Sequence, residues 1–177
     1  MKKVIVTLSI IVIYFVIYFL QVNFFSWFTI AGVKPNLFIL LVLFIGIFMG
    51  GKNGAILGSI IGLYTDFLFS QTIGISCILM GLMGWSGDYI EKKFSKESKL
   101  TIVLMGSIVT IIYEILSYIY KMVKLSASLS ILSFLQILVI EIIYNAFIVI
   151  IFYPLIHKFG IYTEDVMKNK KMLPKYF

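Results

Sequence analysis

Six apolar stretches, separated by short polar segments, make up most of the chain. They cover residues 4–22, 36–49, 54–69, 73–87, 100–122 and 131–156. A helix needs about 20 apolar residues to cross the hydrocarbon core of a bilayer. The second, third and fourth stretches are shorter, so we expect them to be tilted, broken or partly re-entrant, which requires shielding of their backbone by protein. The pattern predicts an all-α, polytopic membrane helix bundle with about six transmembrane helices.

Composition agrees with this pattern and bounds the number of domains. Hydrophobic residues make up 61% of the 177 positions, whereas soluble domains contain about 45 to 50% apolar residues. Little of the chain is left for a soluble module once the apolar stretches are set aside. We therefore expect a single integral membrane domain over residues 1–177.

The lysines indicate how the chain crosses the membrane. All fifteen basic residues are lysine and the net charge is +7. If the amino terminus is cytoplasmic and the loops alternate, twelve lysines fall on the cytoplasmic side and three outside, as the preference of lysine for cytoplasmic loops requires. The cytoplasmic set is Lys2, Lys3, Lys52, Lys92, Lys93, Lys96, Lys99, Lys158, Lys168, Lys170, Lys171 and Lys175, and the outer set is Lys34, Lys121 and Lys124. Both termini are then cytoplasmic, and residues 158–177 form a basic tail in solvent or on the lipid surface.

The same charge does not indicate a nucleic-acid partner. Arginine is absent, and the lysines lie in short clusters between apolar runs, whereas nucleic-acid readers rely on arginine and on a continuous basic face. The first apolar run has no small-residue cleavage site after it, so we expect a retained span and not a cleaved signal. The aromatic residues that follow it, Phe24, Phe25, Trp27 and Phe28, are expected at the membrane interface, with a partner-binding surface as the alternative.

Glycine is concentrated in the middle of the chain. Ten of the thirteen glycines lie between Gly46 and Gly87. Gly54, Gly58 and Gly62 recur every four residues, which places them on one helix face where another backbone can approach closely. Close helix packing is the favoured interpretation over a ligand-cradling role, because no nucleotide-binding glycine motif is present.

Three acidic residues fall inside predicted spans: Asp66, Glu114 and Glu141. A charged carboxylate near the centre of a membrane helix costs about 3 kcal/mol, so each is expected to stay protonated, to face a cavity or to hydrogen-bond to Tyr, Ser or Asn. With Asn145, one helical turn after Glu141, they form a candidate polar interior that binds a lipid headgroup, a small ligand or a polar group of a partner. The alternative is structural, with polar side chains that hold the helices in register.

Enzymatic activity is not expected. His157, the only histidine, lies beside Lys158 at the end of the last span, too far along the helix to act with the internal acids. Intramembrane metalloproteases need the H-E-x-x-H helix and rhomboid-like proteases a Ser and His pair, and neither can be assembled here. With one cysteine, Cys77, there is no cysteine-based zinc cluster or intrachain disulfide. We expect no catalytic residue, metal or cofactor.

Pro35, Asn36 and Leu37 open the run PNLFILLVLFIGIFMGGKNGAILG, and Gly62, Asp66 and Gly74 lie in the segment GLYTDFLFSQTIG. These two segments resemble the bacterial rod shape-determining MreD family. The first is similar to the family's Pro, acidic or amide, Leu start of the second helix, and the second to its G-x-x-x-D segment with a later glycine.

The last apolar run adds to this resemblance. Asn145 and Pro154 in YNAFIVIIFYPLIHK are similar to the family's last helix. The chain departs from the family in having Asn36 where many relatives have Asp, and in lacking a frequent proline before Gly74.

This resemblance implies a non-enzymatic scaffold of the cell-elongation machinery in the bacterial cytoplasmic membrane. Such a protein would bind the bitopic protein MreC and, through it, connect MreB filaments with the RodA glycosyltransferase and its partner transpeptidase in peptidoglycan synthesis. Hydropathy alone predicts only the bundle with a polar interior.

Two other functions stay open. One is the substrate-binding subunit of an energy-coupling-factor vitamin transporter, which has similar size, charge and span number. Its docking motif Ala-x-x-x-Ala in the first span is missing, because the first alanine is Ala31. The other is a small ion or proton carrier that uses the three internal acids as a relay.

Overall fold

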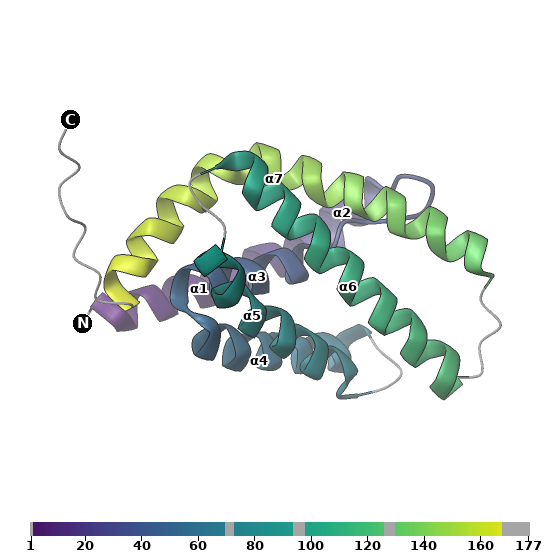
Figure 1. Cartoon of the computed structure of the whole chain (residues 1–177), viewed down its shortest axis with the longest axis horizontal. Coiled ribbons are helices and arrows are strands. Elements are labelled where there is room, and N and C mark those ends of the chain that lie inside the picture. Colours follow the sequence, from purple (N-terminus) through teal and green to yellow (C-terminus); the bar gives the residue numbers. More distant parts are fainter. Residues whose placement is uncertain (1, 70–72, 94–97, 126–129, 168–177) are drawn as a thin grey trace.

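The computed structural model describes residues 2–69, 73–93, 98–125 and 130–167. Within these residues the secondary structure is helical, apart from loops and one isolated bridge between Ile30 and Val33, which confirms the predicted all-α class. The helices are α1 (Lys2–Phe19), the π-helix η1 (Leu20–Phe24), α2 (Phe25–Trp27), α3 (Leu37–Met49), α4 (Gly51–Phe69), α5 (Ile75–Lys93), α6 (Lys99–Leu125) and α7 (Ile131–Met167). Because η1 and α2 continue α1, the described chain contains six long helical segments (Figure 1).

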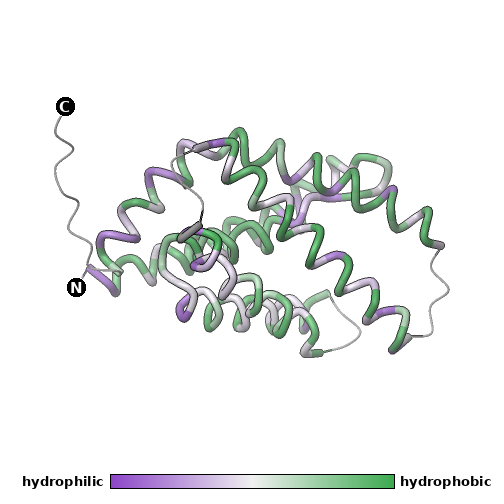
Figure 2. The backbone as a smooth tube through the Cα atoms, in the orientation of Figure 1, coloured by the Kyte–Doolittle hydropathy of each residue, from purple (hydrophilic) through white to green (hydrophobic). Residues whose placement is uncertain are grey.

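Three of these segments are long and apolar enough to cross a membrane. They are Lys2–Trp27, Lys99–Lys124 and Ile131–Met167, and α3 is a shorter apolar helix. Most of α1, α3 and α6 is hydrophobic, whereas hydrophilic residues recur in the last turns of α7 (Figure 2). Large apolar side chains such as Val4, Ile11 and Phe15 on α1 are exposed, as is normal for a face that contacts lipid.

Helix α3 is the centre of the bundle. Twelve of its thirteen residues are buried, and only Phe44 is partly exposed. A helix that is apolar all round is stable only when it is covered on every side, and here α4, α5 and α7 pack against it. At a rise of about 1.5 Å per residue, its length is about 20 Å. A helix too short to cross a bilayer alone is therefore enclosed by protein.

A glycine lets the chain turn back directly from α3 into α4. Gly50 has a φ of 91°, in the left-handed region that residues with a Cβ rarely adopt. Its N–H donates to the carbonyl of Gly46 at 3.1 Å, and the N–H of Gly54 donates to the Gly50 carbonyl at 2.9 Å. The reversal needs one residue and leaves both helix ends hydrogen-bonded.

Close backbone contact joins α4 to α5. Gly54, Gly58 and Gly62, for which we predicted close helix packing, all face α5, and a Cβ at any of them would collide with a backbone carbonyl of that helix. The carbonyls belong, in the same order, to Gly84, Met80 and Ser76. Small residues at four-residue spacing are what close approach between membrane helices requires.

Glycines of α3 extend this contact to a third helix. A Cβ at Gly46 would collide with the carbonyl of Gly84 and would lie 3.2 Å from the Cα of Gly87. Gly46, Gly54 and Gly84 thus meet at one point, where α3, α4 and α5 cross. The glycine-rich part of the sequence forms the most closely packed part of the fold.

Helix α7 extends beyond residue 156, the predicted end of the last span. We expected residues 158–177 to form a tail, but residues 158–167 continue the helix, and Gly160, Thr163 and Glu164 are buried. Pro154 lies inside the helix, where a proline removes one backbone hydrogen bond and kinks the axis without ending the helix when packing supports both sides. The axis of α7 bends in this region, and its last turns lie beside the start of α1 (Figure 1). Lys96 and residues 168–177 of the predicted cytoplasmic set lie outside the described residues.

Candidate functional site

The carboxylate of Asp66 caps helix α5. Asp66 is completely buried near the end of α4. Its Oδ2 accepts hydrogen bonds from the backbone N–H of Gly74 at 2.7 Å and of Ser76 at 3.0 Å. The first N–H groups of a helix have no partner within that helix, and the positive end of its dipole favours an anion. Asp66 supplies from α4 the cap that Gly74, having no side chain, cannot supply from its own position.

Two glycines allow Asp66 to reach this position. Gly62, one turn before Asp66, brings the backbone of α4 against Ser76 and Cys77. Gly74 has a φ of 109°, which only glycine adopts readily. The motif formed by Gly62, Asp66 and Gly74 is therefore one structural unit that holds α4 and α5 together.

The start of α3 is held by side chains from three segments. Its own cap is Asn36, whose Oδ1 accepts the Ile39 N–H at 3.3 Å. The Asn36 N–H donates to Oδ1 of Asn145 on α7 at 2.9 Å. Gln21, within η1, donates to the carbonyl of Pro35 at 2.7 Å and accepts the Leu37 N–H at 3.1 Å. In an apolar surrounding every backbone donor needs a partner, and here two side chains distant in sequence provide them.

Asn145 also joins α7 to α6. Its Nδ2 donates to Oγ1 of Thr110 at 3.0 Å, and that hydroxyl donates to the Gly106 carbonyl at 2.9 Å. Asn145 and Thr110 are both buried. One amide therefore connects α3, α6 and α7, and its neighbour Tyr144 adds a bond from its hydroxyl to the Phe28 carbonyl at 2.7 Å.

Glu114 on α6 and Glu141 on α7 face each other, one helical turn away from Thr110 and Asn145. Glu114 is four residues after Thr110 and Glu141 four residues before Asn145, so the antiparallel helices place the two pairs in adjacent layers. The two carboxyl groups lie close enough to interact electrostatically with each other and with Lys121. Glu141 is 5% exposed, and its Oε1 has no hydrogen-bond partner within the described part of the chain.

The structure therefore divides the predicted polar interior. Glu114, Glu141 and Asn145 line one seam between α6 and α7, whereas Asp66 belongs to the α4–α5 hairpin. Tyr113 of α6 connects the seam with the hairpin, because its buried hydroxyl lies 3.4 Å from Oγ of Ser76 on α5.

Two residues of these networks, Gln21 and Thr110, were not predicted from the sequence. A polar residue at the end of an apolar run was the only available signal for Gln21, and Thr110 gave none, because threonine is common in membrane helices.

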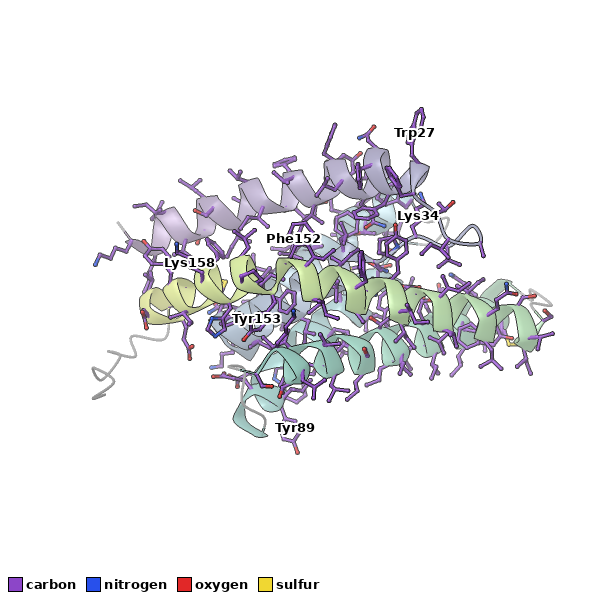
Figure 3. The ribbon with its side chains drawn as sticks, turned by 90° about the horizontal axis from the view of Figure 1, so that it is seen from above. Trp27, Lys34, Tyr89, Phe152, Tyr153 and Lys158 are labelled. Carbon is purple, nitrogen blue, oxygen red and sulfur yellow. The ribbon has the colours of Figure 1, made fainter. Side chains whose placement is uncertain are left out.

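An apolar groove runs between α1, α3 and α7. Its volume is about 390 Å³, and its lining is hydrophobic apart from Thr163 near one end. Phe152 points from α7 toward α1, while Tyr153 points to the other side of α7 (Figure 3).

Over the residues that the structure describes, no group of three or more His, Cys, Asp or Glu side chains is arranged to hold a metal ion.

Comparison with protein families decides the assignment. The family model described as rod shape-determining protein MreD matches residues 1–162. The chain belongs to the MreD family. MreD proteins act in rod-shape determination together with other proteins of the shape-determining complex, and the family is not known as an enzyme family. No curated protein and no solved structure matches the chain.

Proposed function

We propose that this MreD-family protein crosses the bacterial cytoplasmic membrane six times, with both termini in the cytoplasm. The lysine distribution supports this orientation. The arrangement of the helices supports it too, because the start of α1 and the end of α7 lie at one end of the molecule (Figure 1). The short α3 is accommodated because α4, α5 and α7 cover it.

In this membrane the protein acts as a scaffold of the cell-elongation complex. It binds MreC and, through it, couples MreB filaments to peptidoglycan synthesis by RodA and its transpeptidase. The observation that carries this proposal is the family match over residues 1–162. The rigid joining of the helices by Asp66 and Asn145 fits a protein that must hold partners in fixed positions.

The seam between α6 and α7 is the face that we assign to the partner. Glu114 is partly exposed there, and Glu141 has an unpartnered oxygen. Around them, Ile115, Ile119 and Ile143 are exposed. A polar group of a partner's membrane helix would pair with the carboxyl groups, since interhelical hydrogen bonds stabilise such complexes in lipid.

Copurification tests this proposal. Tagged protein is coexpressed with MreC, extracted in mild detergent, and the MreC retained per mole of protein is measured. Glu141→Gln keeps the size of the side chain but changes one acceptor into a donor, and we expect about tenfold less retained MreC, as for loss of one interhelical hydrogen bond in a membrane. Asp165→Asn at the far end of the same helix is the matched control and should retain MreC as the wild type does.

The outcomes of this experiment test the scaffold function and the α6–α7 binding face separately. Absence of MreC from the wild-type preparation contradicts the scaffold function. Full retention by Glu141→Gln and Glu114→Gln rejects only the α6–α7 seam as the binding face. Vitamin uptake that depends on the protein would instead favour the transporter subunit.

A further inference from the structure

The groove between α1, α3 and α7 has the size of a site for a small ligand. Its volume is about 390 Å³, within the range of pockets that hold single small molecules, about 300 to 1,000 Å³. One hydrocarbon chain fits this space.

The side chains that line the groove also favour a flexible hydrocarbon. Val16 of α1, Phe44 of α3 and Phe152 of α7 are typical of them. Helix–helix contacts in membranes use small residues that let backbones approach, but the one glycine of the lining, Gly160, is already covered by the ring of Phe48. Such a lining has no hydrogen bonds to offer along most of its length, and an acyl chain needs none.

Charge is found at one end of the groove. Lys158 is three residues from the lining residue Leu155, and Lys3 is seven residues from the lining residue Ile10, so each lysine shares a helix face with the groove. Both lysines are exposed. Figure 3 shows Lys158 near the start of α1, with Trp27 and Lys34 at the opposite end of that helix. Two cations at the mouth of an apolar groove complement the phosphate of a lipid headgroup.

We propose that the groove binds one anionic phospholipid, with an acyl chain between α1 and α7 and the phosphate beside Lys3 and Lys158. This lipid completes the packing of α1. Val6 and Ile10 are the only buried residues of that helix, whereas Ile13 and Ile17, which pack against the core and line the groove, are only partly buried. The lipid site does not depend on MreC.

Native mass spectrometry of the purified protein tests this inference. The protein is reconstituted into vesicles of equal phosphatidylglycerol and phosphatidylcholine, extracted in mild detergent, and the retained lipids are counted. Val16→Trp places an indole in the groove, and we expect about tenfold less retained lipid because a bulky side chain in a filled space excludes the occupant. Val4→Trp, on the same helix and equally exposed but outside the lining of the groove, is the control and should retain lipid as the wild type does.

The headgroup is tested separately. Lys3→Gln with Lys158→Gln should lower the preference for phosphatidylglycerol by about fivefold per lysine, the effect of one cation near an anionic lipid, while Lys34→Gln should leave it unchanged. Helical circular dichroism and size-exclusion chromatography verify that each variant is folded.

Three results would overturn the inference. One is equal lipid retention by folded Val16→Trp and Val4→Trp. Another is equal retention of the two lipids by the wild type. The third is a bound protein in place of the lipid, seen as a dimer or heteromer that Val16→Trp abolishes.

Discussion

The buried side chains with polar groups are used mainly to hold helices together. Asp66 binds two backbone N–H groups of the α5 start, and Asn145 links three helices. In lipid such groups have no water to bind when their partner is lost. Each therefore predicts a measurable loss of stability on replacement.

Asp66→Ala should destabilise the protein by about 1 to 3 kcal/mol, because it leaves the Gly74 and Ser76 N–H groups buried without an acceptor. Thermal unfolding in detergent, followed by helical circular dichroism, measures this. Thr65→Val, which removes only a bond to the Ile61 carbonyl within α4, is the control. A loss no larger than that of the control would mean that Asp66 does not cap α5.

Asn145→Leu should cost about 1 to 3 kcal/mol for the same reason, since it leaves the Asn36 N–H without its acceptor. Thr110→Val should cost less, because its hydroxyl bonds back to its own helix at Gly106. The same unfolding assay compares the two. Equal small effects would contradict the role assigned to the Asn145 amide.

The importance of these residues was visible in the sequence, but their partners were not. Asp66 and Asn145 stood out because polar groups are rare in apolar runs. Whether Asp66 faced a cavity or another helix depended on a contact with residues eight and ten positions away across a turn, which periodicity does not encode. Gln21 lies in a π-turn, and no sequence pattern distinguishes that turn from an α-helix.

At the scale of helices, the glycine face of α4 determines the closest contact of the fold. Gly58 lies against the carbonyl of Met80, 2.5 Å from where its Cβ would be. Backbone cannot yield as a flexible side chain does. Residues in this face therefore tolerate no added atoms.

Gly58→Ala should destabilise the protein by about 1 to 3 kcal/mol through overpacking. Gly106→Ala on α6 is the matched control, since its Cβ would meet only Leu40 and Val149 side chains at 3.4 and 3.8 Å. The control should be neutral or stabilising by up to about 1 kcal/mol, the gain of alanine over glycine in a helix. Thermal unfolding of both variants checks this, and a stable Gly58→Ala protein would disprove the close α4–α5 contact.

Helix number followed from the hydropathy pattern, whereas helix ends did not. The apolar run ended at Ile156, yet α7 continues to Met167 because Gly160 and Thr163 find cover against the bundle. A mixed polar segment gives a weak hydropathy signal even when one side of it is buried. The predicted tail was wrong for residues 158–167 for that reason.

At the scale of the molecule, the six crossings that we propose would place Lys34 and Lys52 on opposite sides of the membrane. Single cysteines at these two positions, in a Cys77→Ala background, test this with a membrane-impermeant maleimide on intact cells. We expect labelling at position 34 only, and labelling at position 52 after permeabilisation. Labelling of both in intact cells would show that α3 does not cross between them.

The family match covers residues 1–162, from α1 into the last turns of α7. Three sequence segments, around Asn36, Asp66 and Asn145, already predicted it, and the family match confirms it. In the structure these segments form the cap of α3, the cap of α5 and the link of α7 to α3 and α6. The residues that carry the resemblance are therefore those that determine the packing of the bundle.

Depletion of the protein in a rod-shaped host tests the central claim most directly. Cell shape is followed by microscopy while the wild-type gene or the Gly58→Ala variant is expressed from a second copy. We expect round cells on depletion, rods with the wild-type copy, and at best partial recovery with the variant. Depleted cells that stay rod-shaped would contradict the account.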